Sequence, residues 1–308
     1  MTTSSLTRVA LIGECMLELQ GQALGAMTQG FGGDTLNTAV YLARCGGPSL
    51  SVSYATALGD DRFSSLMMDA WRAEGIELDM VRRLPGRLPG LYMIELNEAG
   101  ERSFSYWRDS AAARDYFNEA STPLEQRVSE WGERDAFYLS GISLAILPPA
   151  GRERLFTLMQ NLRERGVRVV FDNNYRPRLW PDAAVARSCF ERAFELASVA
   201  LVTADDHELL FDGADARMLS TPELLIKRGA ASTLVREPGG AWSEAAAERV
   251  AKVVDTTAAG DSFAAGYLAR RLHGASALDA AGFGNRLAAR VIQHRGALIP
   301  REAMADLL

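Results

Sequence analysis

Lysine is nearly absent from this chain. Among its 308 residues only Lys227 and Lys252 are lysines, so arginine supplies almost all of the positive charge, and the formal net charge is −6. No block of basic residues occurs, and arginines do not alternate with aromatic residues. Because a nucleic-acid-binding surface needs a basic footprint of that kind, the sequence argues against nucleic acid as a partner.

Cysteine is also scarce. Cys15, Cys45 and Cys189 are odd in number and far apart, which argues against a disulfide framework and favours a reducing compartment. The first residues lack the basic segment and long apolar run of a signal peptide, and no stretch approaches the ~20 apolar residues of a membrane span. We therefore expect a soluble, cytoplasmic protein without a membrane partner.

Several catalytic motifs are missing as well. A P-loop needs a Gly-Lys-Ser/Thr sequence, and neither lysine stands in that context. The chain has no HExxH and no GxSxG motif, and His207, His273 and His294 lack the spacing of metal ligands. Any nucleotide chemistry must therefore use something other than a P-loop lysine.

Short apolar runs alternate with segments of helical periodicity along most of the chain. This alternation is typical of a mostly parallel sheet covered by helices, and the length allows one large domain or two. We predict strands near 9–12, 51–58, 135–140, 167–172, 199–203, 232–237 and 250–254, and helices near 36–46, 63–75, 152–166, 185–197, 221–229 and 261–274.

One region departs from this alternation and reads as a β-hairpin. Residues 91–96 and 102–108 are strand-like and flank a turn at Asn97–Gly100. Period-2 alternation places Tyr92 with Ile94 on one face, and Phe104, Tyr106 and Arg108 together on the returning strand. Inside an α/β chain such a hairpin is either an excursion at the sheet edge or a lid. Together with residues near 14–29 it could form a small antiparallel flap.

The stretch DTTAAGDSF, residues 255–263, carries the strongest functional signal. Ala258, Ala259 and Gly260 are small, so the backbone can approach a ligand closely, and Asp261 stands where a helix begins. Free N–H groups and the helix dipole make such a position an anion site. An aspartate there can also take a proton from a hydroxyl that attacks a phosphate. The simpler alternative is that Asp261 only caps the helix.

DTTAAGDSF resembles the C-terminal signature of the ribokinase-like (PfkB) carbohydrate kinases, Asp-Thr-x-Gly-Ala-Gly-Asp, with Ala258 where glycine is usual. The segment FGGDTLNTAVYLARCG resembles the family's N-terminal signature. The two motifs lie at opposite ends of the chain, so the resemblance covers essentially all of it. It implies a single ribokinase-like catalytic domain of residues 1–308, a three-layer α/β/α fold with a mostly parallel central sheet. A small antiparallel β lid would come from about 14–32 and 88–110.

Within the family, GECMLEL, FDNNYRPRLW and VIQHRGALIPREAM are most similar to the kinases of 2-keto-3-deoxygluconate. The resemblance implies ATP-dependent phosphorylation of this sugar acid at its terminal C6 hydroxyl, with Mg²⁺. The alternatives are a kinase for a neutral ketose such as fructose and a catalytically silent sugar-binding regulator. The arginines of YWR and NNYRPR favour an acid, and the intact Asp261 argues against a silent protein. A homo-oligomer stays possible.

The resemblance also assigns roles to individual residues. Asp261 would be the base, and Ala258, Ala259 and Gly260 would form the anion hole and contact the nucleotide. The sugar would meet Gly33, Asp34, Asn37, Tyr92, Tyr106, Arg108, Arg176 and Asp261. ATP would meet Asn174, Arg236, Gly239, Gly240 and Asn285, and Mg²⁺ would be organised by Asp205 and Glu208.

Simpler explanations exist for some of these residues. Asp34 could be a helix cap, the aromatic lid face could be a solvated hairpin, and the polar residues of FDNNYRPRLW could be a loop ion-pair cluster. Asp205 and Glu208 could be an acidic pair favoured by the dipole of a helix start.

The segment STLVREPGGAW differs from the family pattern, in which a strand runs into Lys-x-Gly-x-x-Gly beside the nucleotide. Arg236 replaces the lysine there, and Pro238-Gly239-Gly240 replaces the turn. The alternative alignment uses IKRGA, with Lys227. We expect a helix over 221–229 that ends at Gly229, so the sequence favours Arg236 and places Lys227 on an outer helix.

Overall fold

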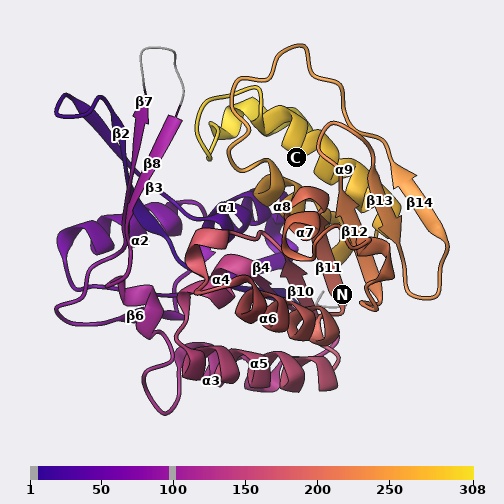
Figure 1. Ribbon diagram of the computed structural model, residues 1–308, viewed down its shortest axis with the longest axis horizontal. Helices are drawn as coiled ribbons and strands as arrows, with labels where there is room; N and C mark the ends of the chain where they lie inside the picture. The colour runs from indigo at the N-terminus through magenta and orange to yellow at the C-terminus, as the bar shows by residue number, and fades with distance from the viewer. Residues whose placement is uncertain (1–5, 97–101) are drawn as a thin grey trace.

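The computed structural model describes residues 6–96 and 102–308. A ten-stranded sheet forms its centre, in the order β14-β13-β12-β11-β10-β9-β1-β4-β5, with β6 paired to β4 beside this path (Figure 1). All pairs are parallel except β12–β13 and β13–β14. The strands are β1 (Thr7–Ile12), β4 (Leu50–Leu58), β5 (Ile76–Glu77), β6 (Val81–Arg83), β9 (Ala136–Ser140), β10 (Arg168–Asp172), β11 (Val199–Thr203), β12 (Glu223–Lys227), β13 (Thr233–Arg236) and β14 (Trp242–Ala245).

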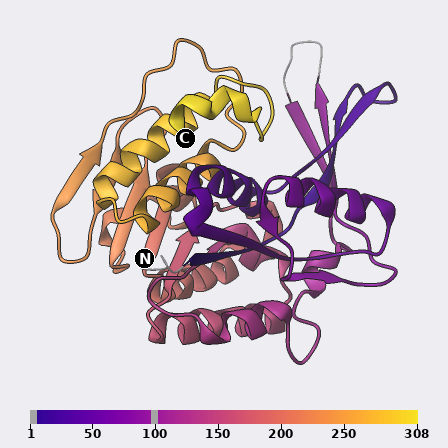
Figure 2. The ribbon, with the colours of Figure 1, turned by 180° about the vertical axis from the view of Figure 1, so that it is seen from behind.

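Helices cover both faces of this sheet (Figures 1 and 2), and each layer has its own apolar core. Because the strands are buried between two layers, they are nearly continuous apolar runs. One face carries α1 (Asp34–Gly46), α2 (Arg62–Ala73), α8 (Ala259–Leu272) and α9 (Ala277–Val291). The other carries α3 (Pro123–Arg127), α4 (Gly141–Ile146), α5 (Pro149–Glu164), α6 (Ala183–Leu196) and α7 (Ala204–Leu210). The predicted three-layer α/β/α fold is confirmed.

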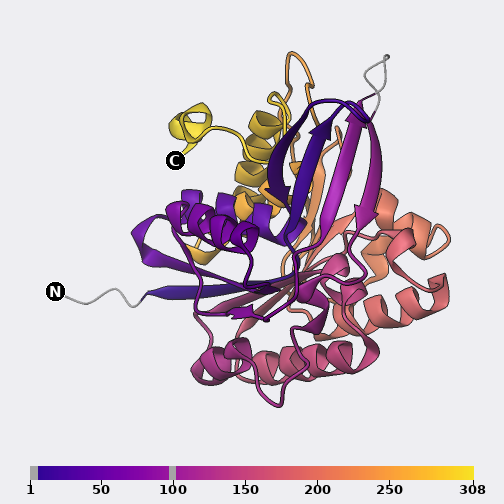
Figure 3. The same ribbon diagram turned by 90° about the vertical axis from the view of Figure 1, so that its left-hand side faces the viewer.

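Four strands form a second, small sheet that stands away from the central one (Figure 3). Its order is β3-β2-β7-β8, from β2 (Met16–Gly21), β3 (Met27–Gly32), β7 (Leu91–Leu96) and β8 (Arg102–Trp107). Two of its pairs are antiparallel, whereas β2 and β7 run parallel. We call this sheet the lid. The predicted turn at Asn97–Gly100 lies outside the described residues.

The predicted side-chain faces of the hairpin agree with the strand register. Tyr92 pairs with Tyr106, and Ile94 pairs with Phe104. The rings of Tyr92 and Tyr106 are stacked with their centroids 6.0 Å apart, and those of Phe104 and Tyr106 are 6.3 Å apart. Phe104 and Tyr106 are exposed although they are large aromatic residues. The lid therefore presents an aromatic face.

Two predictions of secondary structure were wrong. The segment 221–229, predicted as a helix, contains β12, which pairs with β11 on one side and β13 on the other. Its residues Leu224–Ile226 are buried between the two helix layers, and burial of that kind overrides the helix propensity of Glu, Leu and Lys. The segment 250–254, predicted as a strand, forms none; Val253 and Val254 are exposed and have no strand neighbour.

Candidate active site

A cavity of about 420 Å³ opens at the carboxyl edge of the central sheet. Asp172, Thr203 and Lys227, the last residues of β10, β11 and β12, reach it from the sheet. Parallel strands end at the same edge, so residues distant in sequence meet there. The structure also brings to this cavity eleven of the predicted site residues, namely Gly33, Asp34, Asn37, Tyr92, Tyr106, Asn174, Arg176, Ala258, Ala259, Gly260 and Asp261.

Asp261 lies in the first turn of α8 but does not cap it. The N-cap is Ala258, and no side chain makes a capping bond there. The Asp261 Oδ2 atom instead accepts a hydrogen bond of 2.9 Å from Nδ2 of Asn37 on α1. The capping explanation is therefore excluded, and the carboxylate is held toward the cavity by a neighbouring helix.

The first turn of α8 supplies backbone N–H groups that have no carbonyl partner within the helix. Ala258, Ala259 and Gly260, at the start of this turn, line the cavity. Ala258 has φ 61° and ψ 15°, a left-handed conformation that glycine adopts more easily. The alanine thus keeps the backbone shape for which glycine is the usual residue in the signature.

Gly33 and Asp34, at the N-terminus of α1, also line this cavity. Gly33 is the N-cap of α1, and a Cβ on it would lie 2.1 Å from the carbonyl oxygen of Glu14, so only glycine fits this close approach. Asp34 makes no capping bond. Its Oδ2 accepts a hydrogen bond of 2.6 Å from Nδ2 of Asn174. The cap explanation for Asp34 therefore does not hold either.

Lys227 is a site residue that the sequence reasoning missed. As the last residue of β12, it points its Nζ into the cavity, 3.1 and 2.8 Å from the two carboxylate oxygens of Asp172. A Cβ built on Gly260 would lie 3.7 Å from this Nζ. In the sequence, the signal for this strand end was the apolar run Leu224–Ile226 followed by Lys227 and, two residues later, by Gly229. In the structure Gly229 has φ 59°, as a turn glycine often does. The prediction that Lys227 lies on an outer helix was therefore wrong, and its position in the cavity favours the alternative alignment with IKRGA.

Arg236, Gly239 and Gly240 are not brought to this cavity. The Arg236 guanidinium donates to the carbonyl oxygens of Arg217, Leu219 and Thr221 and stacks on Trp242. Gly239 and Gly240 lie between β13 and β14, which form the antiparallel edge of the sheet. The predicted nucleotide contacts of these three residues therefore have no support from their positions.

A second cavity, of about 800 Å³, adjoins the first and shares Thr256 and Ala259 with it. Gly229 and Ala230, from the turn after β12, line one side, and Asn285 of α9 lines another. The Asn285 amide donates to the carbonyl oxygens of Ala245 and Ala246, and its Oδ1 accepts from Thr233. Asn285 thus fixes the wall of this cavity.

The predicted metal residues Asp205 and Glu208 are exposed on the seven-residue helix α7 and line neither cavity. Their neighbour Asp206 lines the first cavity, where its carboxylate accepts from the backbone N–H of Tyr175 and lies 3.3 Å from Arg176. Within residues 6–96 and 102–308, no cluster of His, Cys, Asp and Glu is arranged to hold a metal ion by itself.

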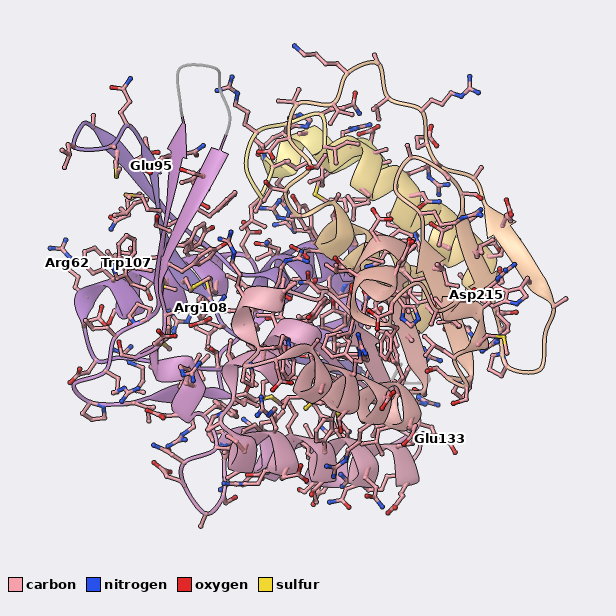
Figure 4. All side chains as sticks on the ribbon, in the orientation of Figure 1. Arg62, Glu95, Trp107, Arg108, Glu133 and Asp215 are labelled. Atoms are coloured by element: carbon pink, nitrogen blue, oxygen red, sulfur yellow. The ribbon has the colours of Figure 1, made fainter. Side chains whose placement is uncertain are left out.

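Arg108 lies at the base of the lid, beyond the end of β8 (Figure 4). It forms a buried ion pair with Glu14, a residue that the sequence reasoning did not select. Burial raises the pKa of the Glu14 carboxyl, and the charge of Arg108 opposes this rise. Arg108 lines a third cavity, of about 730 Å³, which shares Asp34, Tyr106 and Arg176 with the first.

The sequence between residues 6 and 304 matches the model of the pfkB family of carbohydrate kinases. The chain belongs to this family. Its relatives include the 2-dehydro-3-deoxygluconokinases of Dickeya dadantii, 48% identical with 99% of each chain covered, and of Escherichia coli K12, 46% identical with 96% of this chain and 98% of the relative covered. A fructokinase of Escherichia coli is 29% identical over 85% of this chain and 83% of its own length.

Solved structures of the family share the fold. A fructokinase with bound ATP from Xylella fastidiosa matches with a TM-score of 0.83 at 24% identity, with 97% of each chain covered. A 2-dehydro-3-deoxygluconokinase from Thermotoga maritima matches with a TM-score of 0.79 at 21% identity, with 98% of each chain covered. Within the described part of the chain, no helix is long and apolar enough to cross a membrane. The predicted membership of the PfkB family is confirmed.

The signature aspartate of this PfkB kinase has an unusual environment. Burial is the main cause that raises the pKa of Asp261 to about 8, and the negative charges of Asp34 and Asp172 raise it further. The hydrogen bond from Asn37 and the charge of Lys227 lower the pKa of Asp261. The pKa of Asp261 therefore lies near neutral pH, where a carboxyl group can both accept and release a proton.

We expect kcat/KM to fall as the pH is lowered through about 8, because a general base must be ionised to accept a proton. Asp34→Asn removes a negative charge that raises the pKa of Asp261, so the inflection should move to lower pH. Glu195→Gln, an exposed change on α6, is the matched control and should leave the inflection in place. A rate that does not depend on pH across this region would contradict the assignment of Asp261 as base.

Proposed function

We propose that this chain transfers the γ-phosphoryl group of ATP to the terminal C6 hydroxyl of 2-keto-3-deoxy-D-gluconate. The products are 2-keto-3-deoxy-6-phosphogluconate and ADP. One observation carries the proposal: a buried carboxylate, Asp261, lies at a helix N-terminus in a cavity that continues past Arg176 toward Arg108. A base at one end and arginines toward the other suit a substrate with a hydroxyl and a carboxylate at its two ends. The names of the relatives at 46% and 48% identity support this choice.

In the proposed reaction, Asp261 takes the proton of the C6 hydroxyl while the hydroxyl oxygen attacks the γ-phosphorus. The bond between the γ-phosphorus and the bridging oxygen breaks, and ADP leaves. The N–H groups of the first turn of α8 and the ammonium group of Lys227 face the region where negative charge develops. Preorganised donors of this kind are among the strongest sources of catalysis.

The adenosine part of ATP fits the second cavity. That cavity is lined by apolar side chains, including Val250, Val253 and Ile292, and by Asn285. It joins the first cavity at Thr256 and Ala259, next to the N-terminus of α8. A nucleotide bound there would direct its phosphates toward Gly260 and Lys227, which is the usual position of an anion at a helix N-terminus.

Mg²⁺ would accompany the ATP phosphates. This ion keeps several waters and needs only one or two protein carboxylates beside the phosphates, a demand that the oxygen donors here meet. Asp206 lies in the cavity wall, and Asp205 and Glu208 lie on the same short helix but do not line the cavity. When bound, the ion would neutralise charge on the transferring phosphoryl group.

The lid would close over the sugar and exclude water, which otherwise competes with the C6 hydroxyl for the phosphoryl group. Tyr92, Phe104 and Tyr106 of the lid line the first cavity, and the latter two are exposed in the structure. When a ligand fills the cavity, closure of the lid would remove the apolar surface of these side chains from water, which is favourable.

Hydrogen exchange tests this motion. We expect the backbone amides of β7 and β8 to exchange more slowly when the sugar acid and an ATP analogue bind, because closure orders these strands. The amides of β5, which pairs with β4 at one edge of the central sheet, serve as the internal control. Unchanged exchange in the lid would mean that the hairpin is static.

Asp261→Asn tests the chemistry. We expect it to fold, to bind sugar and ATP, and to lose about 10²- to 10⁴-fold in kcat, because the amide cannot act as a base. The assay should couple ADP release to a panel that contains 2-keto-3-deoxygluconate and fructose. Preference for fructose would replace the proposed substrate, and turnover of neither sugar by the unmodified chain would favour a silent binding protein.

The arginines test the acid preference. Arg176 is exposed and only loosely paired with Asp206, so Arg176→Ala should raise KM for the sugar acid about ten- to a hundred-fold, the worth of a charge-assisted hydrogen bond. Arg108→Ala should be combined with Glu14→Gln, since Glu14 would otherwise be left buried and unpaired. Both variants should change KM for fructose much less. Equal losses for the two sugars would mean that these arginines do not recognise the carboxylate.

A further inference from the structure

Next to the lid base lies a separate cavity of about 480 Å³ that is rich in arginine. Arg108, Arg114, Arg152 and Arg178 line it, whereas Asp109 is the one acidic residue in its wall. The arginines come from four different places: the end of the lid, the segment after it, α5, and the loop between β10 and α6. Figure 4 shows Arg108 between the lid strands and the region of α4. Such convergence is unexpected in a chain whose net charge is −6.

These arginines differ from the others on the same elements by having few partners. Among the described residues, the side chains of Arg114, Arg152 and Arg178 form no ion pair or hydrogen bond. Arg152 lies over the ring of Trp180 at 5.4 Å, and the charge of Arg114 acts on the buried Glu14. By contrast Arg154, two positions along α5, is paired with Glu125 and with backbone carbonyls. The unpaired arginines therefore leave positive charge directed at one space.

Arg108 adds a buried donor to this cavity. The side chain is only 9% exposed, and although its Nη2 is paired with Glu14, its Nε is buried and has no hydrogen-bond partner. An unsatisfied buried donor of a charged group is costly. Glu14 therefore does not use the full donor capacity of this guanidinium, which forms part of the cavity wall.

The start of α5 reinforces the positive potential. This 16-residue helix begins at Pro149, has no side-chain cap and no acidic residue in its first turn, and carries Arg152 there. A helix N-terminus favours negative charge, so an arginine in the first turn is opposed by the dipole. An anion between the arginines and the helix end would offset this repulsion.

We propose that this cavity binds a small oxyanion, a carboxylate or phosphate group, beside the proposed sugar site and away from the nucleotide cavity. Planar guanidinium groups match two oxygens of either group. Arg108 and Arg178 also line the cavity that contains Tyr106 and Arg176. An anion at the new site shares these arginines with the sugar acid, so it should raise KM for that acid and leave kcat unchanged. The predicted effect on KM rests on the proposed function, whereas the binding of the anion does not.

Calorimetric titration with inorganic phosphate tests the site directly. The enzyme is first saturated with a non-hydrolysable ATP analogue, so that the phosphate positions beside α8 are filled. We expect one phosphate to bind, and Arg152→Gln/Arg178→Gln to weaken its binding at least about tenfold, the worth of one charge-assisted hydrogen bond. Arg62→Gln is the matched control, since Arg62 is an exposed arginine on α2 that does not line the cavity.

A second variant and a second ligand sharpen the result. Arg178 is exposed and has no ion-pair or hydrogen-bond partner for its side chain within residues 6–96 and 102–308, so Arg178→Gln alone should fold normally and still weaken phosphate binding if the proposal is right. Malonate replaces phosphate in a parallel titration, and binding of either anion that the variants weaken supports the site. Absence of binding, or equal binding to the variants and the unmodified enzyme, would overturn it. If the chain binds phosphate here but fails to phosphorylate the sugar acid, the anion site stands and the proposed function falls.

Discussion

The burial of Asp261 beside other carboxylates is the constraint on which the rest of the site depends. Asp34 and Asp172 both raise the pKa of Asp261, and burial raises it more. Left alone, such a cluster would bind protons and lose its charge. The charge of Lys227 and the hydrogen bond from the Asn37 amide oppose this by lowering the pKa of Asp261, and Lys227 also pairs with Asp172. The site therefore needs its one lysine although the chain has almost none.

The parallel sheet explains how these groups come together. Asp172 and Lys227 end β10 and β12, while Asn37 and Asp261 lie in the first turns of α1 and α8, which pack against each other on one face. None of these residues is near another in sequence. The doubly covered sheet places all the strand ends on one edge and aims two helix N-termini at it, so the positive ends of the dipoles lie where the carboxylates are.

Much of this arrangement was predictable from the sequence, because it is encoded locally. The small residues before Asp261, the glycines before Asp34 and the alternation of the hairpin each predict a local shape, and the structure has these shapes. What failed was β12. Glu223–Lys227 has residues that favour helices, and its strand conformation depends on burial between two helix layers and on two neighbouring strands. That information is not local, and the error removed Lys227 from the predicted site.

The pair of Glu14 and Arg108 was hidden for the same reason, since 94 positions separate the two residues. Glu14 follows β1 of the central sheet, whereas Arg108 follows β8 of the lid, so the pair connects the two sheets. Each partner also keeps one buried polar atom unsatisfied, Oε1 on Glu14 and Nε on Arg108. A half-satisfied buried pair gains from a further hydrogen-bonding group. The unsatisfied atoms are an acceptor on Glu14 and a donor on Arg108, so a group that accepts from Arg108 would still leave Oε1 of Glu14 without a donor. The pair therefore joins the two sheets without using all of its hydrogen-bonding capacity.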